Sequence, residues 1–260
     1  MKPRRLARAL LAILAVPPCV AAAQSGPTQE NFIIRGEYRA WWPGLEEQIQ
    51  KGSAGVPDGT LLDGTNDLGI TDKRTWEVRG TIRFAHWLKL RGSYTDVDYD
   101  GSATPATPFV YGGSRFTAGQ PVETSQKGAV YTADFEFDFV SRPQGYVGAT
   151  AGAKLLDLDT LILAPNSGVR ETDTNRVPSP SIGLTSRMYS KHFSFEGEIS
   201  GLTMGDRGKA YEIQTTLRFH ISDHLALSGG YRRISFQGTD GATFTDFKLR
   251  KFFAGVELSL

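Results

Sequence analysis

The sequence predicts an all-β protein, a single closed antiparallel β-barrel that crosses a membrane with about ten strands. Apolar and polar side chains alternate with a period of two in segment after segment. Most of these segments reach the roughly 9–11 residues that a tilted strand needs to cross a bilayer. The connections between them alternate between short and long, as in barrels whose two rims face different compartments. A soluble sandwich gives no reason for such sorting.

The N-terminal residues 1–23 have the features of a secretory signal peptide. A basic start is followed by a short apolar run and by three alanines that end at Ala23, where we expect cleavage. Pro17 and Pro18 would break a helix too early for a membrane anchor. We therefore expect export through the Sec pathway and a mature barrel domain of residues 24–260.

The composition of the mature chain excludes several classes of function. Cys19 is the single cysteine and leaves with the signal, so no disulfide or thiol chemistry is expected. A lipid anchor on Cys19 is also disfavoured, because Pro18 stands where a small residue is needed. Cleavage leaves 25 basic and 28 acidic side chains. The mature chain therefore has no excess of basic residues of the kind that nucleic-acid binding requires.

The alternating segments give the expected strands. We expect ten, with eight or twelve as alternatives, over residues 31–42, 74–84, 88–99, 126–140, 145–158, 178–189, 193–203, 208–219, 225–237 and 246–260. The clearest segment places Phe135 and Phe137 on one face and Asp134, Glu136 and Asp138 on the other. In a membrane barrel the aromatic face meets lipid and the charged face lines the lumen.

The connections and the aromatic residues support the same arrangement. Tight turns are expected at 85–87, 141–144, 190–192 and 220–224. Long loops are expected at 43–73, 100–125 and 159–177, with modest ones at 204–207 and 238–245. Aromatic residues gather at both ends of the strands, as expected of two belts at the lipid–water interfaces. An even number of strands puts both chain ends on the short-turn side.

The last strand carries a recognisable pattern. The stretch "FFAGVELSL" resembles the insertion signal that the barrel assembly machinery reads in bacterial outer-membrane β-barrel proteins. Gly255, Leu258 and Leu260 match its glycine and its two hydrophobic positions. The sequence departs from the pattern at Leu260, which replaces an aromatic residue, and at Phe253, which stands at a usually polar position.

The likeness to outer-membrane barrels covers the whole mature chain. The order of "DLGITD", "HWLKLRGSY" and "YGGSRFTAGQPVET" also looks like uncharacterised small-barrel families, which imply no particular activity. The resemblance implies a place in the outer membrane of a Gram-negative bacterium, with the short turns in the periplasm. It also implies outer-membrane lipid and lipopolysaccharide as partners, and the assembly machinery as a partner during biogenesis.

The lumen face is expected to be dense in charge. Strand parity assigns to it Arg35, Glu37, Arg39, Glu77, Arg79, Arg83, Lys89, Arg91, Asp134, Glu136, Asp138, Glu196, Glu198, Glu212 and Arg218. If the third and fourth strands pair so that Lys89 faces Asp138, Arg91 faces Glu136. A barrel of this size has an interior just wide enough to be filled by side chains, and charges inside it must be paired or hydrated.

The residues that could carry catalysis or bind a metal are few. Four histidines, His86, His192, His220 and His224, all fall at the short turns. His220 and Ser222 share a spacing found in outer-membrane deacylases, but no acidic residue follows at a matching distance, and a hydrogen-bonded turn explains them. The first long loop holds five residues with side-chain oxygens, Asp58, Asp63, Asn66, Asp67 and Asp72, which match no calcium-binding spacing and suit turns. We expect no cofactor, no metal and no enzymatic activity.

Two functions remain open at this stage. One is a largely filled barrel that serves as a structural or surface-interaction protein. The other is a narrow porin-like channel for ions or small solutes. An outer-membrane hydrolase is the weaker third reading, since acid–base groups must reach their substrate and the histidines are expected at the opposite rim.

Overall fold

A computed structural model describes residues 32–53, 59–203, 208–240 and 243–260. The expected signal peptide with Cys19, the expected turn at 204–207 and the loop residue Asp58 lie outside the described residues. No helix in the described chain is long and apolar enough to cross a membrane.

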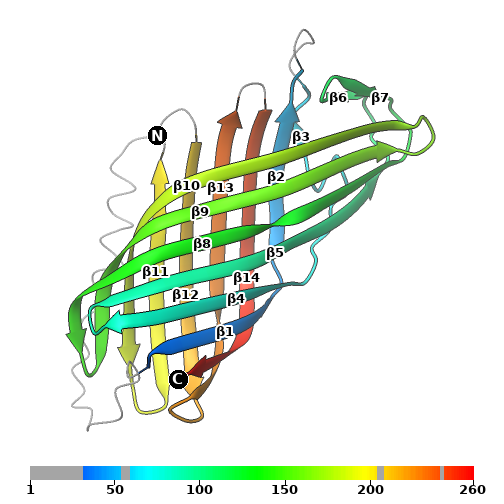
Figure 1. Ribbon diagram of the computed structural model, residues 1–260. Coiled ribbons are helices and arrows are strands. Elements are labelled where there is room, and N and C mark those ends of the chain that lie inside the picture. The colour runs from blue at the N-terminus through cyan, green and yellow to red at the C-terminus, as the bar shows by residue number, and fades with distance from the viewer. Residues whose placement is uncertain (1–31, 54–58, 204–207, 241–242) are drawn as a thin grey trace, which may run out of the picture.

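Ten antiparallel strands form a ring that closes where β1 pairs with β14, as Figure 1 shows. In ring order they are β1 (Ile34–Trp41), β4 (Thr75–Ala85), β5 (Leu88–Ala103), β8 (Val122–Arg142), β9 (Gly145–Ala164), β10 (Val169–Tyr189), β11 (Phe193–Thr203), β12 (Gly208–His220), β13 (Leu225–Asp240) and β14 (Thr243–Ser259). The predicted closed ten-stranded barrel is confirmed.

The two ends of the described chain meet at the rim with the short turns. The amide of Ile33 donates to the carbonyl of Leu260 over 2.6 Å, and the amide of Leu260 donates to Ile34 over 2.8 Å. The hairpins β4–β5, β8–β9, β10–β11 and β12–β13 turn at this same rim. This is the rim that the resemblance assigns to the periplasm.

At the opposite rim the predicted loops are largely wrong. The expected loop 159–177 is strand, because β9 continues to Ala164 and β10 begins at Val169. A tight turn joins them, with Gly168 at a φ of +70° and its amide bonded to the carbonyl of Ala164. The strands are 20 and 21 residues long, well beyond what a bilayer requires.

The other two long connections also contain strands. The stretch 43–73 holds β2 (Gly44–Lys51), which pairs with β14 beyond the end of β1, and β3 (Leu62–Asp63), which pairs with β2. The stretch 100–125 holds the ends of β5 and β8 and a small hairpin of β6 (Phe109–Tyr111) and β7 (Ser114–Phe116). These segments fold over the barrel and do not extend freely from it.

The outer surface has an apolar belt that ends at aromatic rings. Trp76, Tyr94 and Tyr131 lie side by side on β4, β5 and β8, with ring centroids 5.0 and 5.3 Å apart. On the other side of the ring, Tyr231 and Phe252 lie 5.5 Å apart on β13 and β14. We call the part of the barrel between the short turns and these rings the membrane half, and the part beyond them the outer half.

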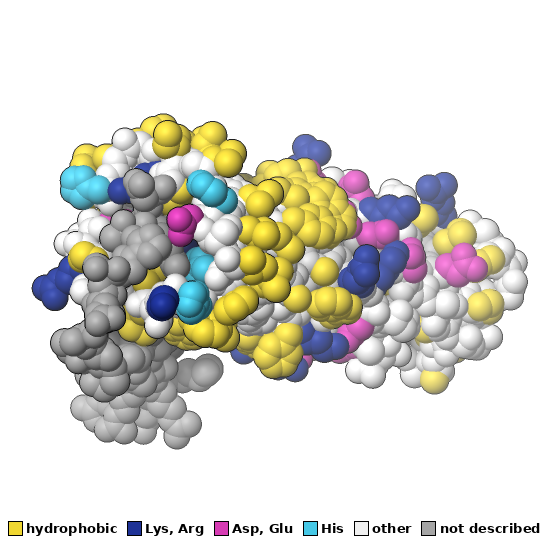
Figure 2. Space-filling view, turned by 90° about the horizontal axis from the view of Figure 1, so that it is seen from below, with side chains coloured by type: hydrophobic (Ala, Val, Ile, Leu, Met, Phe, Trp, Pro, Cys, Tyr) yellow, Lys and Arg dark blue, Asp and Glu magenta, His cyan; other side chains and the backbone are white. Residues whose placement is uncertain are grey.

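Outward side chains of the membrane half are apolar and exposed. Phe135 and Phe137 are 47% and 43% exposed, while their neighbours Asp134 and Glu136 are 5% and 1% exposed. In Figure 2, yellow side chains cover this part of the surface, and blue, magenta and white ones follow beyond it. An apolar surface of this extent is stable against lipid and not against water.

The outer half contains the hydrophobic core. Its barrel strands contribute inward side chains such as Val97, Tyr99, Leu158 and Ile162, and the folded-in segments contribute Leu45, Ile49, Leu62, Leu68, Ile70, Phe109, Tyr111 and Phe116. The Phe109 and Phe116 rings stack with centroids 4.6 Å apart across the β6–β7 hairpin. The interior of the outer half is thus packed like that of a soluble protein.

Candidate functional site

The interior of the membrane half holds a cluster of buried charges, which is the candidate functional site. Nine cationic and nine anionic side chains from all ten barrel strands line it. The cations are Arg35, Arg39, Arg79, Lys89, Arg91, Lys154, Arg187, Arg218 and Arg232. The anions are Glu37, Glu77, Asp134, Glu136, Asp138, Glu196, Glu198, Glu212 and Glu257. Alternation along each strand turns these side chains inward, so the barrel carries its polar residues inside.

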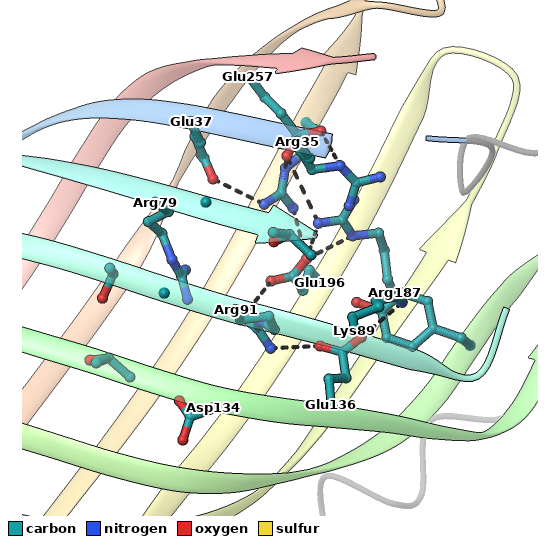
Figure 3. Close-up of a pocket in the computed structure, with 17 residues that line it drawn as sticks. Arg35, Glu37, Arg79, Lys89, Arg91, Asp134, Glu136, Arg187, Glu196 and Glu257 are labelled. Carbon is teal, nitrogen blue, oxygen red and sulfur yellow. Dashed lines mark hydrogen bonds and ion pairs between the residues drawn. The ribbon is translucent and has the colours of Figure 1, made fainter. Parts of the chain in front are cut away.

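Glu196 and Glu257 organise the end of the cluster near the short turns. Glu196 accepts a hydrogen bond from Arg187 Nε at 2.6 Å and forms an ion pair with Arg218 at 3.1 Å. Glu257 forms ion pairs with Arg218 Nε at 2.7 Å and with Arg35 at 3.4 Å. Figure 3 shows Arg35, Arg187, Glu196 and Glu257 converging from strands far apart in the sequence. Arg187 and Arg218 therefore each link two or more carboxylates across the lumen.

The middle of the cluster joins β5 and β8 to β11. Lys89 Nζ lies 2.8 Å from both Glu136 and Asp138, and its ammonium lies 3.6 Å from the Tyr146 ring centroid. Arg91 lies 2.8 Å from Glu136 and 2.5 Å from Glu198. Charge-assisted contacts of this kind are about twice as strong as neutral hydrogen bonds.

The backbone register of these strands differs from the one considered from the sequence. Lys89 is the cross-strand partner of Glu136, and Arg91 is the partner of Asp134, a shift of two residues. Parity is kept, so the same residues face inward. The side chains reach along the strand, and Lys89 still contacts Asp138 while Arg91 contacts Glu136.

The far end of the cluster borders the hydrophobic core. Arg232 forms ion pairs with Glu77 at 2.6 Å and Glu212 at 2.7 Å, and its guanidinium lies 5.3 Å from the Trp41 ring centroid. Lys154 forms a second ion pair with Glu212. This layer is the transition from charged to apolar interior.

Little free space remains among the charged side chains. The cavity lined by Arg79, Arg91, Asp134 and their neighbours has a volume of about 30 Å³. A cavity needs about 10–15 Å³ by this measure to hold one water molecule, so this one has room for two or three. The described membrane half is therefore filled by its own side chains, and charge is balanced within it.

The structure places the predicted lumen residues on the inner face. Fourteen of them join the cluster: Arg35, Glu37, Arg39, Glu77, Arg79, Lys89, Arg91, Asp134, Glu136, Asp138, Glu196, Glu198, Glu212 and Arg218. Arg83 has the same parity but lies half-buried near the β4–β5 turn, with no ion pair among the described residues. Gly255 has no side chain to contribute to the cluster, and the side chains of Leu258 and Leu260 are 57% and 76% exposed.

Sequence reasoning missed four members of the cluster. Lys154, Arg187, Arg232 and Glu257 are 2%, 4%, 1% and 2% exposed and each forms an ion pair. All four lie in segments that were predicted as strands. Parity alone would have found them: Glu257, for example, stands between the outward residues Val256 and Leu258.

The histidines lie at the short-turn rim, where Figure 2 shows them in cyan. His220 Nε2 lies 2.9 Å from the hydroxyl of Ser194, which resembles a base and a nucleophile. Ser194 is 0% exposed, however, so no substrate can reach its oxygen. Ser222 Oγ accepts the amide hydrogen of His224, as expected for a turn.

The acidic residues of the first connection serve local structure. Asp63 Oδ1 accepts the amides of Thr65 and Asn66 at 3.0 and 2.8 Å, and Asp67 Oδ2 accepts the amide of Asp63 at 2.8 Å. Asp72 pairs with Lys251. In the described chain, no group of three or more His, Cys, Asp or Glu side chains is placed to hold a metal ion.

Comparison with known proteins gives a likeness of fold. No protein-family model matches the chain, and no curated protein matches its sequence. Among solved structures, the outer-membrane protease OmpT of Escherichia coli matches with a TM-score of 0.58 at 9% identity, over 87% of this chain and 96% of that one. The translocator domain of the autotransporter NalP from Neisseria meningitidis matches with a TM-score of 0.45 at 11% identity, over 98% and 96% of the two chains.

The chain has the fold of bacterial outer-membrane β-barrel proteins. This fold and the apolar belt place it in the outer membrane. At such low identity the likeness to OmpT carries the fold and no activity.

Proposed function

We propose that this protein is a closed, non-conducting barrel that holds its outer half at the cell surface as a structural and interaction element. The observation that carries the proposal is the filled interior: balanced charges leave a cavity of about 30 Å³ in the membrane half. An ion path would need a continuous column of water across the membrane half, and a cavity with room for two or three water molecules does not supply it.

The outer half supports the same proposal. Its hydrophobic core forms a second layer across the barrel, beyond the charged layer. The folded-in segments are tied to the wall: Lys51 Nζ, at the end of β2, lies 2.8 Å from both Asp173 and the Thr172 carbonyl on β10. Ser114 of β7 donates to Glu171 at 2.5 Å. Such a rigid cap suits a surface that binds a partner.

The proposal includes the absence of enzymatic activity. The Ser194 hydroxyl that contacts His220 is fully buried, and the side chains of the charged cluster are buried in the lumen. General acids and bases must come within hydrogen-bond reach of a bound substrate. The decisive assay offers purified wild type phospholipid, lipopolysaccharide and a peptide library. Turnover that is lost in a variant with all four histidines changed to alanine would overturn this part.

Conductance tests the main proposal. Wild type refolded into a planar bilayer is expected to be silent. A variant that replaces residues 104–121 with a short glycine–serine turn removes β6 and β7, and is also expected to be silent because the charged layer remains. The turn is feasible because Ala103 and Val122 are cross-strand partners.

A second variant opens the charged layer. Replacing Arg91, Glu196 and Arg218 with alanine together is expected to produce measurable channels when combined with the hairpin replacement. Replacing the outward Lys127 with glutamine is the matched control. Steady channel openings in the wild type, altered by Arg91→Gln, would overturn the proposal and establish the narrow porin-like channel.

A further inference from the structure

A pair of arginines lies on the outer surface just beyond the aromatic residues of β13 and β14. Arg233 and Arg250 are direct cross-strand partners, and Tyr231 and Phe252 form the cross-strand pair two residues nearer the short turns. Two residues of strand span about 6–7 Å. The two guanidinium groups thus lie at the depth of lipid headgroups, since Tyr and Trp rings mark the edge of the hydrocarbon.

The arrangement is electrostatically unfavourable unless anionic groups lie close to both guanidinium groups. Like charges directly opposite each other on neighbouring strands destabilise a sheet. Arg250 pairs with Glu46 of β2, and its side chain is still 49% exposed. Arg233 has no ion pair among the described residues, and its Nε is buried without a hydrogen-bond partner. Its guanidinium carbon lies 5.9 Å from the Tyr211 ring centroid.

Two lysines extend the same patch. Lys248 lies 3.0 Å from Asp246, and Lys251 pairs with Asp72. Counting these acids and Glu46, the four cations outnumber the described carboxylates that contact them. On the opposite side of the barrel, the residue beyond Tyr94 is Asp96, followed by Asp98 on the same face. At this depth β5 thus carries acidic residues, whereas β13 and β14 carry basic ones.

We propose that Arg233 and Arg250 together bind a phosphate group of a lipopolysaccharide molecule in the outer leaflet, with Lys248 and Lys251 in support. Guanidinium groups match the geometry of phosphate oxygens with paired hydrogen bonds. The acyl chains of the lipid would lie against Phe252, which is 70% exposed on the belt below. The proposal needs the outer half to face the cell exterior and does not depend on whether the barrel conducts.

Lipid binding to the purified barrel tests the proposal. Native mass spectrometry counts lipid A bound to wild type, to Arg233→Gln/Arg250→Gln and to a control variant, Lys127→Gln/Arg176→Gln, on the outer surfaces of β8 and β10. We expect at least a tenfold loss of affinity in the first variant and none in the control. A difference in gel mobility between the unfolded and folded protein shows that each variant forms the barrel. If the double variant does not fold, Arg233→Gln alone is tested in its place.

Three further ligands identify the group that is recognised. Lipid A without its phosphates is expected to bind wild type as weakly as lipid A binds the double variant. Phosphatidylglycerol and inorganic phosphate are expected to bind wild type and double variant alike. Equal binding of lipid A to both proteins, or undiminished binding of dephosphorylated lipid A, would refute the proposal. A preference for phosphatidylglycerol that the double variant loses would refute the assignment to lipopolysaccharide.

Discussion

The membrane half of this barrel has a polar interior and an apolar exterior, and the outer half has an apolar interior and a polar exterior. Along β9, Lys154 points inward and Leu155 outward in the membrane half, while Leu156 and Leu158 point inward and Asp157 outward beyond it. The β8–β9 pairing has no register shift there, since its one irregularity lies between Asp138 and Val140. The strand thus keeps its phase, and only the polarity of its two faces changes.

The comparison shows that the surroundings of each half determine which face is apolar. Lipid surrounds the membrane half, so its polar side chains turn inward, where they must pair with one another. Water surrounds the outer half, so its apolar side chains turn inward and pack as a core. The barrel therefore has two kinds of interior along its axis. Ion pairs fill the membrane half, and packed apolar side chains fill the outer half.

Removing a charge from the interior of the membrane half should have the largest effect on the unfolding free energy. Glu196→Ala removes one of the two buried carboxylates that Arg187 and Arg218 both contact. Removing one partner of a buried ion pair costs about 3–5 kcal/mol. We expect this loss in the urea unfolding free energy of the barrel in micelles. Glu123→Ala, on the exposed surface of the outer half, is the control and should change it by less than about 0.5 kcal/mol.

An arginine introduced on the exterior of each half should show how the two outer surfaces differ. Phe135→Arg puts a cation on the lipid face, where it costs roughly 2–4 kcal/mol near the bilayer midplane. Thr174→Arg puts it on the exposed face of β10 in the outer half, next to Asp159, and should cost almost nothing. Folding equilibria in lipid vesicles measure both. Equal losses for the two variants would contradict the division into halves.

Much of this division could be predicted from the sequence, and the errors have physical causes. Period-two alternation located all ten strands because each strand has a polar and an apolar face. The sequence prediction ended the strand at residue 158 and placed a loop at 159–177, whereas β9 continues to Ala164. Beyond Leu155 and Leu156 the apolar side chains turn inward, and a pattern that assumes one apolar face along the whole strand does not anticipate this change. The turn signal at 165–168 was the available clue to the longer hairpin.

The partners within the charged cluster could not be predicted. Parity gives the face of a residue, while the contacts between Glu257 and Arg35 or between Arg232 and Glu77 depend on how the ring closes. The fold of the long connections was also out of reach. Leu62, Leu68 and Phe109 lie in stretches without regular alternation, and their burial comes from packing against strands distant in sequence.

A buried carboxylate lies in the largely apolar interior of the outer half, and it gives the smallest predicted effect. Glu47 on β2 is 3% exposed. Its Oε2 accepts a hydrogen bond from Gln126 at 2.6 Å, and its Oε1 has no partner among the described residues. Burial raises the pKa of Glu47 from 4.5 to about 7, against the opposing effect of the Gln126 hydrogen bond, and the nearby Asp63 raises it further.

The sign of the pH dependence follows from this shift. The unfolded chain releases the proton of Glu47 near pH 4.5, whereas the folded barrel keeps it until about pH 7. The contribution of Glu47 to the unfolding free energy is thus fully present below pH 4.5. It falls as the pH rises to about 7 and stays level above that pH. The loss across this window is at most roughly 3 kcal/mol. Glu47→Gln should abolish that part of the slope, while Glu46→Gln, on the exposed face of the same strand, should keep it. Unfolding free energies in micelles at pH 5 and pH 8 measure the difference. If the unfolding free energy changed with pH equally in wild type and Glu47→Gln, water or a cation would have to reach this carboxylate inside the core.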